Sequence, residues 1–361
     1  MNVNSYIKKF GGYTFEERPF GYVDSLIFSE LSMFSFDSAL EDRESIQLKD
    51  INLDKYINSL VYDSPDRRFN KNQIRAMVES NRYKDLTIKY VRREFSKELV
   101  NQFYAITIVF PNGDFYVSFR GTDISMIGWK EDFLLATQET FLAQEQAREY
   151  LKDVIKKENG NFYIGGHSKG GNIAFYSALH LTEEESKRVI EIYSFDGPGM
   201  RKDIKEFPGY TYVINKMTKF KTFNNMIGSM YNQFEKCKIV HSPGLLFGGH
   251  DVYYWQVNSK TGDFMYAKDV SGTSKRYMKR FMNWVESLPI EDRKLATDTL
   301  FIVFNDCNDI YDLAKYWVKD LLNIRKSLKH YSKEDQDKLK NIFKTLLKYL
   351  FGLEKTINKN N

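Results

Sequence analysis

The spacing of hydrophobic residues changes along this chain, and the changes predict strands that alternate with helices. Two runs of β-branched and aromatic residues, 103–110 and 115–119, flank Pro111-Asn112-Gly113-Asp114. Asn-Gly between two such runs is the strongest short-range signal of a β-hairpin. Further strands are predicted at residues 162–164, 190–195, 211–214, 238–240 and 252–257.

Helical periodicity separates these strands. Apolar residues recur at helical spacing in residues 70–83, 145–157 and about 171–181, and residues 1–60 are expected to form short helices. Strands that alternate with helices predict an α/β fold with helices on both faces of one sheet, mostly parallel after the first hairpin.

After Ser274 the pattern becomes helical. Residues 335–351 carry a continuous apolar stripe with four lysines outside it: Leu339, Ile342, Phe343, Leu346, Leu347 and Leu350, with Lys338, Lys340, Lys344 and Lys348. We therefore predict a catalytic domain at 1–289 and a helical C-terminal extension at 290–361. The stripe suits packing against the rest of the chain. It also suits peripheral contact with an anionic membrane surface or a protein partner, and these alternatives stay open.

Composition and charge narrow the class of protein. The 361 residues are 42% hydrophobic and 28% charged, as in a soluble globular protein. The net charge of +5 is concentrated in residues 321–361, which hold ten Lys/Arg against four Asp/Glu. No nucleic-acid-binding module accompanies this basic tail, so nucleic acid is not an expected partner.

The cysteines and the apolar segments predict a location. The two cysteines, Cys237 and Cys307, are far apart in sequence and exclude a disulfide framework. The N-terminus has no apolar run of the secretory kind, and no stretch approaches the ~20 apolar residues of a membrane span. A soluble, cytoplasmic protein is expected.

One short motif carries chemistry. Gly166-His167-Ser168-Lys169-Gly170 matches G-x-S-x-G, for which chance gives about 0.1 matches in a chain of this length. An apolar strand precedes the motif and a predicted helix follows it. This strand–turn–helix context is typical of the nucleophile elbow of α/β hydrolases, which predicts Ser168 as the nucleophile. The alternative is a glycine-rich turn that binds an anion through backbone N–H groups.

A serine nucleophile also needs donors for the oxyanion that forms on the substrate. The first predicted donor is the backbone N–H of Lys169, the residue after the nucleophile. The second is expected from a loop that follows an earlier strand, and residues 119–123 occupy that place directly after the hairpin.

These residues resemble a known family. "FRGT" followed by "GGHSKGGN" resembles the class 3 lipases, and a closer likeness is to bacterial α/β hydrolases on the same plan. The likeness spans roughly residues 10–260 in five ordered blocks: "FRGTD", "GWKEDF", "GGHSKGGN", "FDGPG" and "HDVYYW". It implies an ester hydrolase, with Thr122 as an oxyanion donor whose hydroxyl adds a second bond.

The general base and its acid partner must follow the serine in this chain order. We favour His250 over His241 as the base because it lies in a late loop, Gly248-Gly249-His250-Asp251. For the acid we choose Asp196, at the end of the 190–195 strand. The class 3 lipases place their aspartate one strand later, where Asn224 stands here. Asp251 is expected to point elsewhere, and Asp196 could instead be a turn-forming residue.

Arg120, Glu131 and Asp132 are expected to play structural roles, with Arg120 paired with an acid of the "GWKEDF" block. His167, inside the elbow, should point away from the catalytic face. The predicted function is a lipase-like or esterase-like acyl hydrolase of ester or lipid substrates that needs no metal or cofactor. The alternative is a catalytically weak hydrolase-fold protein that binds a lipid or a protein partner.

Overall fold

The chain folds around one central sheet. Its structure, a computed structural model, describes residues 1–232, 237–244, 249–303 and 331–351. Within these residues, nine strands lie in the sheet in chain order. They are β1 (Ser45–Gln47), β2 (Thr87–Ser96), β3 (Asn101–Val109), β4 (Phe115–Phe119), β5 (Phe162–His167), β6 (Val189–Phe195), β7 (Met217–Thr222), β8 (Cys237–Val240) and β9 (Tyr266–Ala267). Strands β4 to β8 are parallel, and the outer neighbours pair antiparallel.

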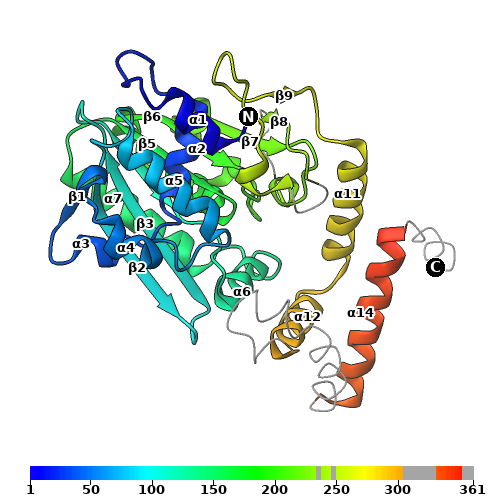
Figure 1. Ribbon diagram of the computed structural model, residues 1–361. Helices are drawn as coiled ribbons and strands as arrows, with labels where there is room; N and C mark the ends of the chain where they lie inside the picture. Colours follow the sequence, from blue (N-terminus) through cyan, green and yellow to red (C-terminus); the bar gives the residue numbers. More distant parts are fainter. Residues whose placement is uncertain (233–236, 245–248, 304–330, 352–361) are drawn as a thin grey trace.

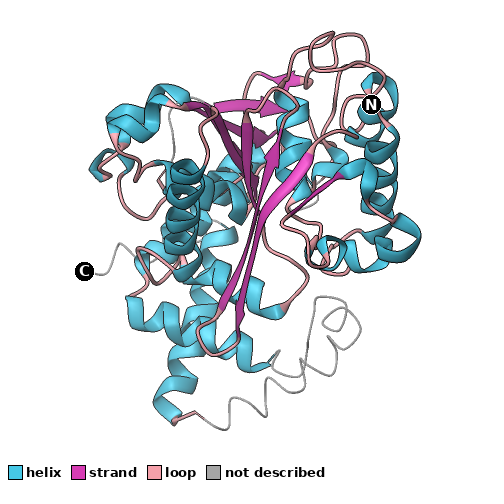
Figure 2. Cartoon of the chain, turned by 90° about the vertical axis from the view of Figure 1, so that its left-hand side faces the viewer, coloured by secondary structure: helices cyan, strands magenta, loops and turns pink. Residues whose placement is uncertain are grey.

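Helices cover both faces of this sheet (Figures 1 and 2). The described helices are α1 (Val3–Phe10), α2 (Tyr22–Leu31), α3 (Asp37–Leu40), α4 (Leu53–Leu60), α5 (Arg67–Glu79), α6 (Met126–Leu134), α7 (Leu142–Lys157), α8 (Lys169–Ala178), α9 (Glu183–Lys187), α10 (Tyr210–Val213), α11 (Gly272–Ser287), α12 (Ile290–Val303) and α14 (Lys333–Phe351). Helix α2 packs on β4 and β5 from one side, while α7 and α8 pack from the other. The predicted α/β-hydrolase architecture is confirmed in class and sheet direction.

The central strands are apolar on both sides because each side meets a different core. Along β3, Phe103 and Ala105 enter the core under α7 and α8, whereas Tyr104, Ile106 and Ile108 enter the core under α1, α2 and α5. Alternate side chains of a strand point to opposite faces, so a strand covered twice is continuously hydrophobic. This burial also fixes the register that brings the loops after β4, β5 and β6 to one sheet edge.

Two predicted strands are wrong. Residues 211–214 lie in helix α10 and the turn after it, where the N–H of Val213 bonds the carbonyl of Gly209. The next strand is β7, which ends at Thr222. Residues 252–254 form a 3₁₀ turn, and the buried positions Val252 and Trp255 are three residues apart. A spacing of three suits a turn and not a strand, whose period is two.

The C-terminal helices pack mainly on one another. Helix α14 lies along α11 and α12 (Figure 1), and Trp284, Val285, Ala296 and Ile342 form their shared core. The indole N–H of Trp284 donates to Thr345 Oγ1 at 3.1 Å. Since α11 belongs to this cluster, the predicted domain boundary after residue 289 falls between packed helices and stays a prediction.

The predicted apolar stripe of α14 is divided between two environments. Leu339 and Ile342 are 1% and 2% exposed, whereas Phe343 and Leu347 are 39% and 55% exposed. Among the described residues, no helix has the length and apolar character needed to cross a bilayer. Cys237 has a free thiol, and Cys307 lies outside the described residues.

Candidate active site

Ser168 stands at the turn between strand β5 and helix α8. Its backbone is left-handed, with φ 56° and ψ −128°, and its N–H bonds the carbonyl of Phe195. A non-glycine residue in this region costs on the order of 1–3 kcal/mol, so the surrounding structure must enforce it. This strained strand–turn–helix geometry agrees with the predicted nucleophile elbow.

Two glycines of the motif allow the turn to be this tight. A Cβ on Gly166 would lie 2.3 Å from the Gly170 carbonyl carbon, and a Cβ on Gly170 would lie 2.2 Å from the Phe119 carbonyl oxygen. Real Cβ atoms do not approach that closely. The glycines therefore let helix α8 and the end of β4 close around Ser168.

His250 and Asp196 meet as predicted. His250 Nδ1 lies 2.7 Å from Asp196 Oδ2, although the residues are 54 positions apart. Asp196 is fully buried at the end of β6 and accepts a second hydrogen bond from the Asn225 side-chain amide through Oδ1. An ionised carboxylate only accepts hydrogen bonds, so it holds the proton of a neutral His250 on Nδ1. Nε2 is then the ring nitrogen that can take a proton.

The alternative acid position is occupied by an amide with another task. Asn224, two residues after β7 ends, donates its side-chain N–H to the carbonyl of Gly244 at 2.9 Å. Its neighbour Asn225 is the residue that reaches Asp196. The candidate acid thus stands at the end of β6, and the loop after β7 supplies a hydrogen-bond donor to it.

No hydrogen bond joins Ser168 to His250 within the described residues. Both side chains are partly accessible, and the ring centroid of His250 lies 4.6 Å from that of His167, the residue before the serine, in a tilted arrangement. Catalytic hydrogen bonds of free enzymes are often long and tighten only when the substrate binds.

The predicted oxyanion loop lies against the elbow. A Cβ on Gly121 would lie 2.8 Å from the His167 carbonyl oxygen and 3.4 Å from Ser168 Cβ. Thr122, the next residue, donates its hydroxyl proton to Asp132 Oδ2 at 2.6 Å. That proton is therefore engaged, which leaves the backbone N–H of Thr122 as the group to meet an oxyanion. Lys169 is the first residue of α8, where helix geometry leaves backbone N–H groups without intrahelical acceptors.

Asp132 is a site residue whose role the sequence did not indicate. Burial, partly offset by Lys169 and Thr122, raises the pKa of Asp132 to about 6. An ionised Asp132 accepts the Thr122 proton and orients the loop. The "GWKEDF" block was the available signal, since it places two acids near the oxyanion loop.

The Lys169 side chain ties the turn at Ser168 to neighbouring elements through its ammonium group. Its ammonium group donates to Glu131 Oε2 at 2.5 Å, to Gln102 Oε1 at 2.6 Å and to the Gln102 carbonyl at 2.9 Å. Lys169 and Glu131 are both buried. The ion pair therefore joins the start of α8 to α6, the helix that carries Asp132.

The predicted pairing of Arg120 with Glu131 or Asp132 is wrong. Arg120 donates to Asp63 at 3.2 Å, to the Ser32 carbonyl at 2.6 Å and to Ser35, and it stacks on Tyr104 at 3.7 Å. Glu131 is instead paired with Lys169. Because side chains alternate between the two faces of a sheet, Arg120, directly after β4, lies on the opposite face. Sequence proximity to two acids did not indicate which face Arg120 occupies.

His167 also differs from expectation. It does not turn away from the site, because Nε2 lies 3.0 Å from the backbone oxygen of His250. Its Nδ1 lies 3.1 Å from Oε1 of Glu30, a buried carboxylate on α2. The available signal was Glu30, the one charged residue in the stretch 26–34.

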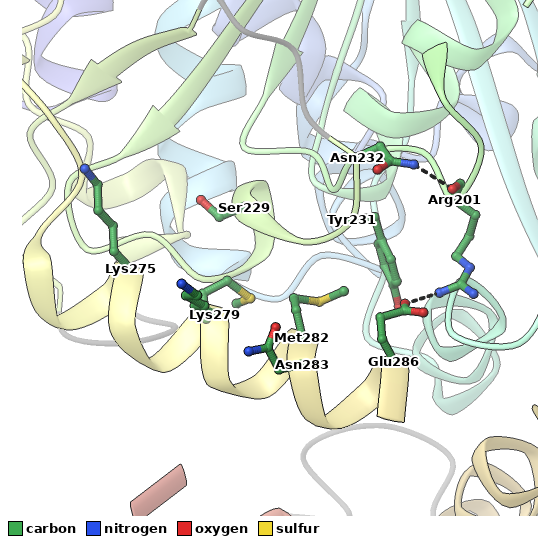
Figure 3. A pocket seen from close by; sticks show the side chains of 10 residues that line it. Arg201, Ser229, Tyr231, Asn232, Lys275, Lys279, Met282, Asn283 and Glu286 are labelled. Atoms are coloured by element: carbon green, nitrogen blue, oxygen red, sulfur yellow. Dashed lines mark hydrogen bonds and ion pairs between the residues drawn. The ribbon is translucent and has the colours of Figure 1, made fainter. Parts of the chain in front are cut away.

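A separate cavity of about 520 Å³ lies between α11 and the loops after β6 and β7 (Figure 3). Arg201, Lys275 and Lys279 line it with Tyr231 and Glu286, and Arg201 pairs with Glu286 at 2.6 Å. Neither Ser168 nor His250 lines this cavity. It is therefore separate from the candidate catalytic residues.

Among known proteins, the chain matches one family model. A protein-family model described as Mbeg1-like matches residues 77–302, well over half of the chain. No curated protein matches the chain in sequence.

Solved lipase structures align at low similarity. M37 lipase aligns at 13% identity over 56% of this chain and 68% of its own, with a TM-score of 0.36. The N225Q mutant of MDLA from Penicillium cyclopium aligns at 13% identity over 68% and 83%, with a TM-score of 0.40. A structure described as of fungal lipases aligns at 12% identity over 74% and 90%, with a TM-score of 0.42.

Proposed function

We propose that this chain, which belongs to the Mbeg1-like family, is a lipase-like serine hydrolase that cleaves carboxylic esters through an acyl-enzyme on Ser168. The observation that carries the proposal is the 2.7 Å contact between Asp196 and His250 beside a serine in left-handed backbone conformation. Such a constellation is recognised by geometry and roles, whatever the positions in sequence.

The first half-reaction follows from the protonation states. Asp196 holds the His250 proton on Nδ1, so Nε2 accepts the proton of Ser168 as its Oγ attacks the ester carbonyl. The backbone N–H groups of Lys169 and Thr122 would stabilise the resulting oxyanion. When the tetrahedral intermediate collapses, His250 returns the proton to the departing alcohol and the acyl group stays on Ser168.

The second half-reaction reverses these roles with water. His250 takes a proton from water, the hydroxide attacks the acyl-enzyme carbonyl, and the same two N–H groups meet the oxyanion. Ser168 Oγ then leaves with the proton from His250, and a carboxylic acid is released. Asp196 stabilises the imidazolium in both halves without taking its proton.

The alternative is a catalytically weak protein that binds a lipid or a partner, and it rests on Asn224 at the acid position of the class 3 lipases and on the C-terminal helices. Asp196 contacts His250 and Asn224 does not, which supports the enzyme. The binding protein is the outcome that the test below would favour if no turnover is found.

Hydrolysis of p-nitrophenyl esters of increasing acyl length tests the proposal. We expect turnover by the wild type and none above background for Ser168→Ala, which removes a reagent and not a packing side chain. A matched control is Ser186→Ala, since it makes the same substitution at a buried serine of α9, away from the site. Equal turnover by the wild type and Ser168→Ala would overturn the proposal.

A further inference from the structure

The two ring nitrogens of His167 both face oxygen acceptors. Nε2 lies 3.0 Å from the backbone oxygen of His250, and Nδ1 lies 3.1 Å from Glu30 Oε1. A carbonyl oxygen cannot donate a proton, and neither can an ionised carboxylate. A neutral imidazole can donate Nε2–H to the His250 carbonyl, but it carries no charge to pair with Glu30, whose Oε1 accepts no hydrogen bond from the described residues. The imidazolium form donates to the same carbonyl and also forms an ion pair with Glu30.

The surrounding charges favour that form. Burial by itself would lower the pKa of His167, but the Glu30 carboxylate, with Asp196 and the His250 carbonyl, outweighs burial and raises it. The charged and titratable groups that act on the ring are Glu30 from α2, Asp196 at the end of β6, and His250 and Asp251 from the base loop, while Asp66, before α5, acts on Asp251.

The partner on the catalytic side is the backbone of the proposed base. The His250 carbonyl accepts from His167 Nε2 at 3.0 Å and lies 3.4 Å from the indole N–H of Trp255. Trp255 is fully buried in the core under α1 and α2, and its N–H does not titrate. The imidazole of His250 is held separately, by Asp196 at 2.7 Å. Of these two donors to the His250 carbonyl, His167 is thus the one that can change its charge.

We propose that protonated His167 is a positioning residue that bridges Glu30 and the His250 carbonyl and so keeps the base aligned with Ser168. The proposal rests on the proposed function, because alignment matters only if His250 takes the proton of Ser168. Misplacement of a catalytic group by about 1 Å can cost on the order of 10²-fold in rate.

The bridge has a defined pH dependence. Because the folded-state pKa of His167 is raised, the bridge is complete at low pH and is lost as pH rises through that pKa. Above it, Nδ1 presents a lone pair to the Glu30 carboxylate and the contact becomes repulsive. The proposed base acts through deprotonated His250. Loss of the His167 bridge should therefore lower the rate on the alkaline side of the pH profile.

Replacing Glu30 separates the charge of the bridge from its geometry. In Glu30→Gln the amide N–H can donate to Nδ1 of a neutral His167, whose Nε2–H still reaches the His250 carbonyl. We expect this variant to keep kcat within a few-fold of the wild type at pH 7 and to lose the alkaline decline due to His167. His167→Ala, which removes the bridge, should lower kcat about 10-fold or more with a smaller change in KM.

The experiment measures kcat and KM for p-nitrophenyl butyrate from pH 6 to 9.5 for the wild type, Glu30→Gln, His167→Ala and Asp66→Asn. Asp66→Asn is the matched control, because it removes a nearby carboxylate that caps α5 and makes no contact with the His167 ring. The control should keep the alkaline decline. Thermal unfolding of each variant reports whether it is folded.

The outcomes separate this proposal from the proposed function. If the wild type neither turns over the ester nor reacts with a fluorophosphonate at Ser168, the proposed function itself fails. If the wild type is active and both Glu30→Gln and Asp66→Asn keep its alkaline limb, the His167 bridge is overturned. This result decides the matter even if His167→Ala does not fold. An alkaline limb that disappears only in Glu30→Gln supports it.

Discussion

Asp196 Oδ2 lies 2.7 Å from His250 Nδ1, and this contact joins the end of strand β6 to a loop 54 residues later. Asp196 is fully buried with φ 52°, a left-handed conformation that an aspartate adopts more readily than most residues. The side-chain amide of Asn225 donates a hydrogen bond to its other oxygen, Oδ1. The parallel strands β5 to β7 therefore deliver serine, acid and a supporting amide to one sheet edge.

Asp196→Asn should reduce kcat for ester hydrolysis by roughly 10⁴-fold, because an amide that donates to Nδ1 moves the His250 proton to Nε2. KM should change little, since the carboxylate is buried and away from substrate. Steady-state kinetics of the purified variant check this. Asn224→Ala is the control and should keep at least a tenth of wild-type kcat. The opposite ranking would place the acid elsewhere.

The buried Lys169–Glu131 pair should be a major contributor to stability as a pair. Lys169→Met leaves the Glu131 carboxylate buried without its cation, and such a change costs about 3–5 kcal/mol. The double variant Lys169→Met/Glu131→Leu should recover much of that loss, because an apolar pair can replace a buried ion pair. Urea unfolding measures both. The exposed pair Lys187–Glu184 is the control, and Lys187→Met should change stability little. Additive losses in the double variant would contradict the coupling.

Asp132 should make stability depend on pH in a defined direction. Its folded-state pKa is raised to about 6 from an ordinary 3.8, so the native state binds this proton more tightly than the unfolded state. The favourable contribution is present below about pH 4 and is lost between about pH 4 and 6. Asp132→Asn keeps an acceptor for Thr122 and removes the charge, so it should stabilise the protein by roughly 1–3 kcal/mol at pH 7 and little at pH 4. Equal effects at both pH values would contradict this assignment.

Helix α14 should respond to a charge differently on its two faces. Ile342→Asp places a carboxylate in the core shared with α11 and α12 and should destabilise the protein by roughly 2–4 kcal/mol. Leu347→Asp, at a residue 55% exposed, is the matched control and should be nearly neutral. Chemical unfolding measures both.

Cosedimentation of the wild type and Leu347→Asp with anionic vesicles at two salt concentrations tests the membrane contact: loss of salt-sensitive binding in the variant would support it.

Sequence patterns correctly predicted the elements whose conformation is set by residues close together in the chain. Asn112-Gly113 predicted the β3–β4 hairpin, and the glycine-flanked serine predicted the turn at Ser168. The choice of Asp196 over Asn224 agrees with the observed contact because a carboxylate at a strand end is brought to the sheet edge. The roles of these residues in catalysis remain proposals.

The errors arose where long-range packing decides. Helix α10 overrides a short β-branched run, and Val252 and Trp255 are buried by a turn and not by a strand. Strand β2, with its polar sequence, was missed because its partner β3 supplies the burial. The partners of Arg120 and His167 come from residues 63 and 30, at separations that no local pattern encodes.

The most direct test of the central claim is covalent labelling of the full-length protein with a fluorophosphonate, which reacts with serines that have an activated hydroxyl. The account predicts one adduct by intact mass, mapped to Ser168 by peptide mass spectrometry, and none in Ser168→Ala. It also predicts labelling slowed by orders of magnitude in Asp196→Asn. A folded wild type that stays unlabelled, or an adduct on another serine, would contradict it.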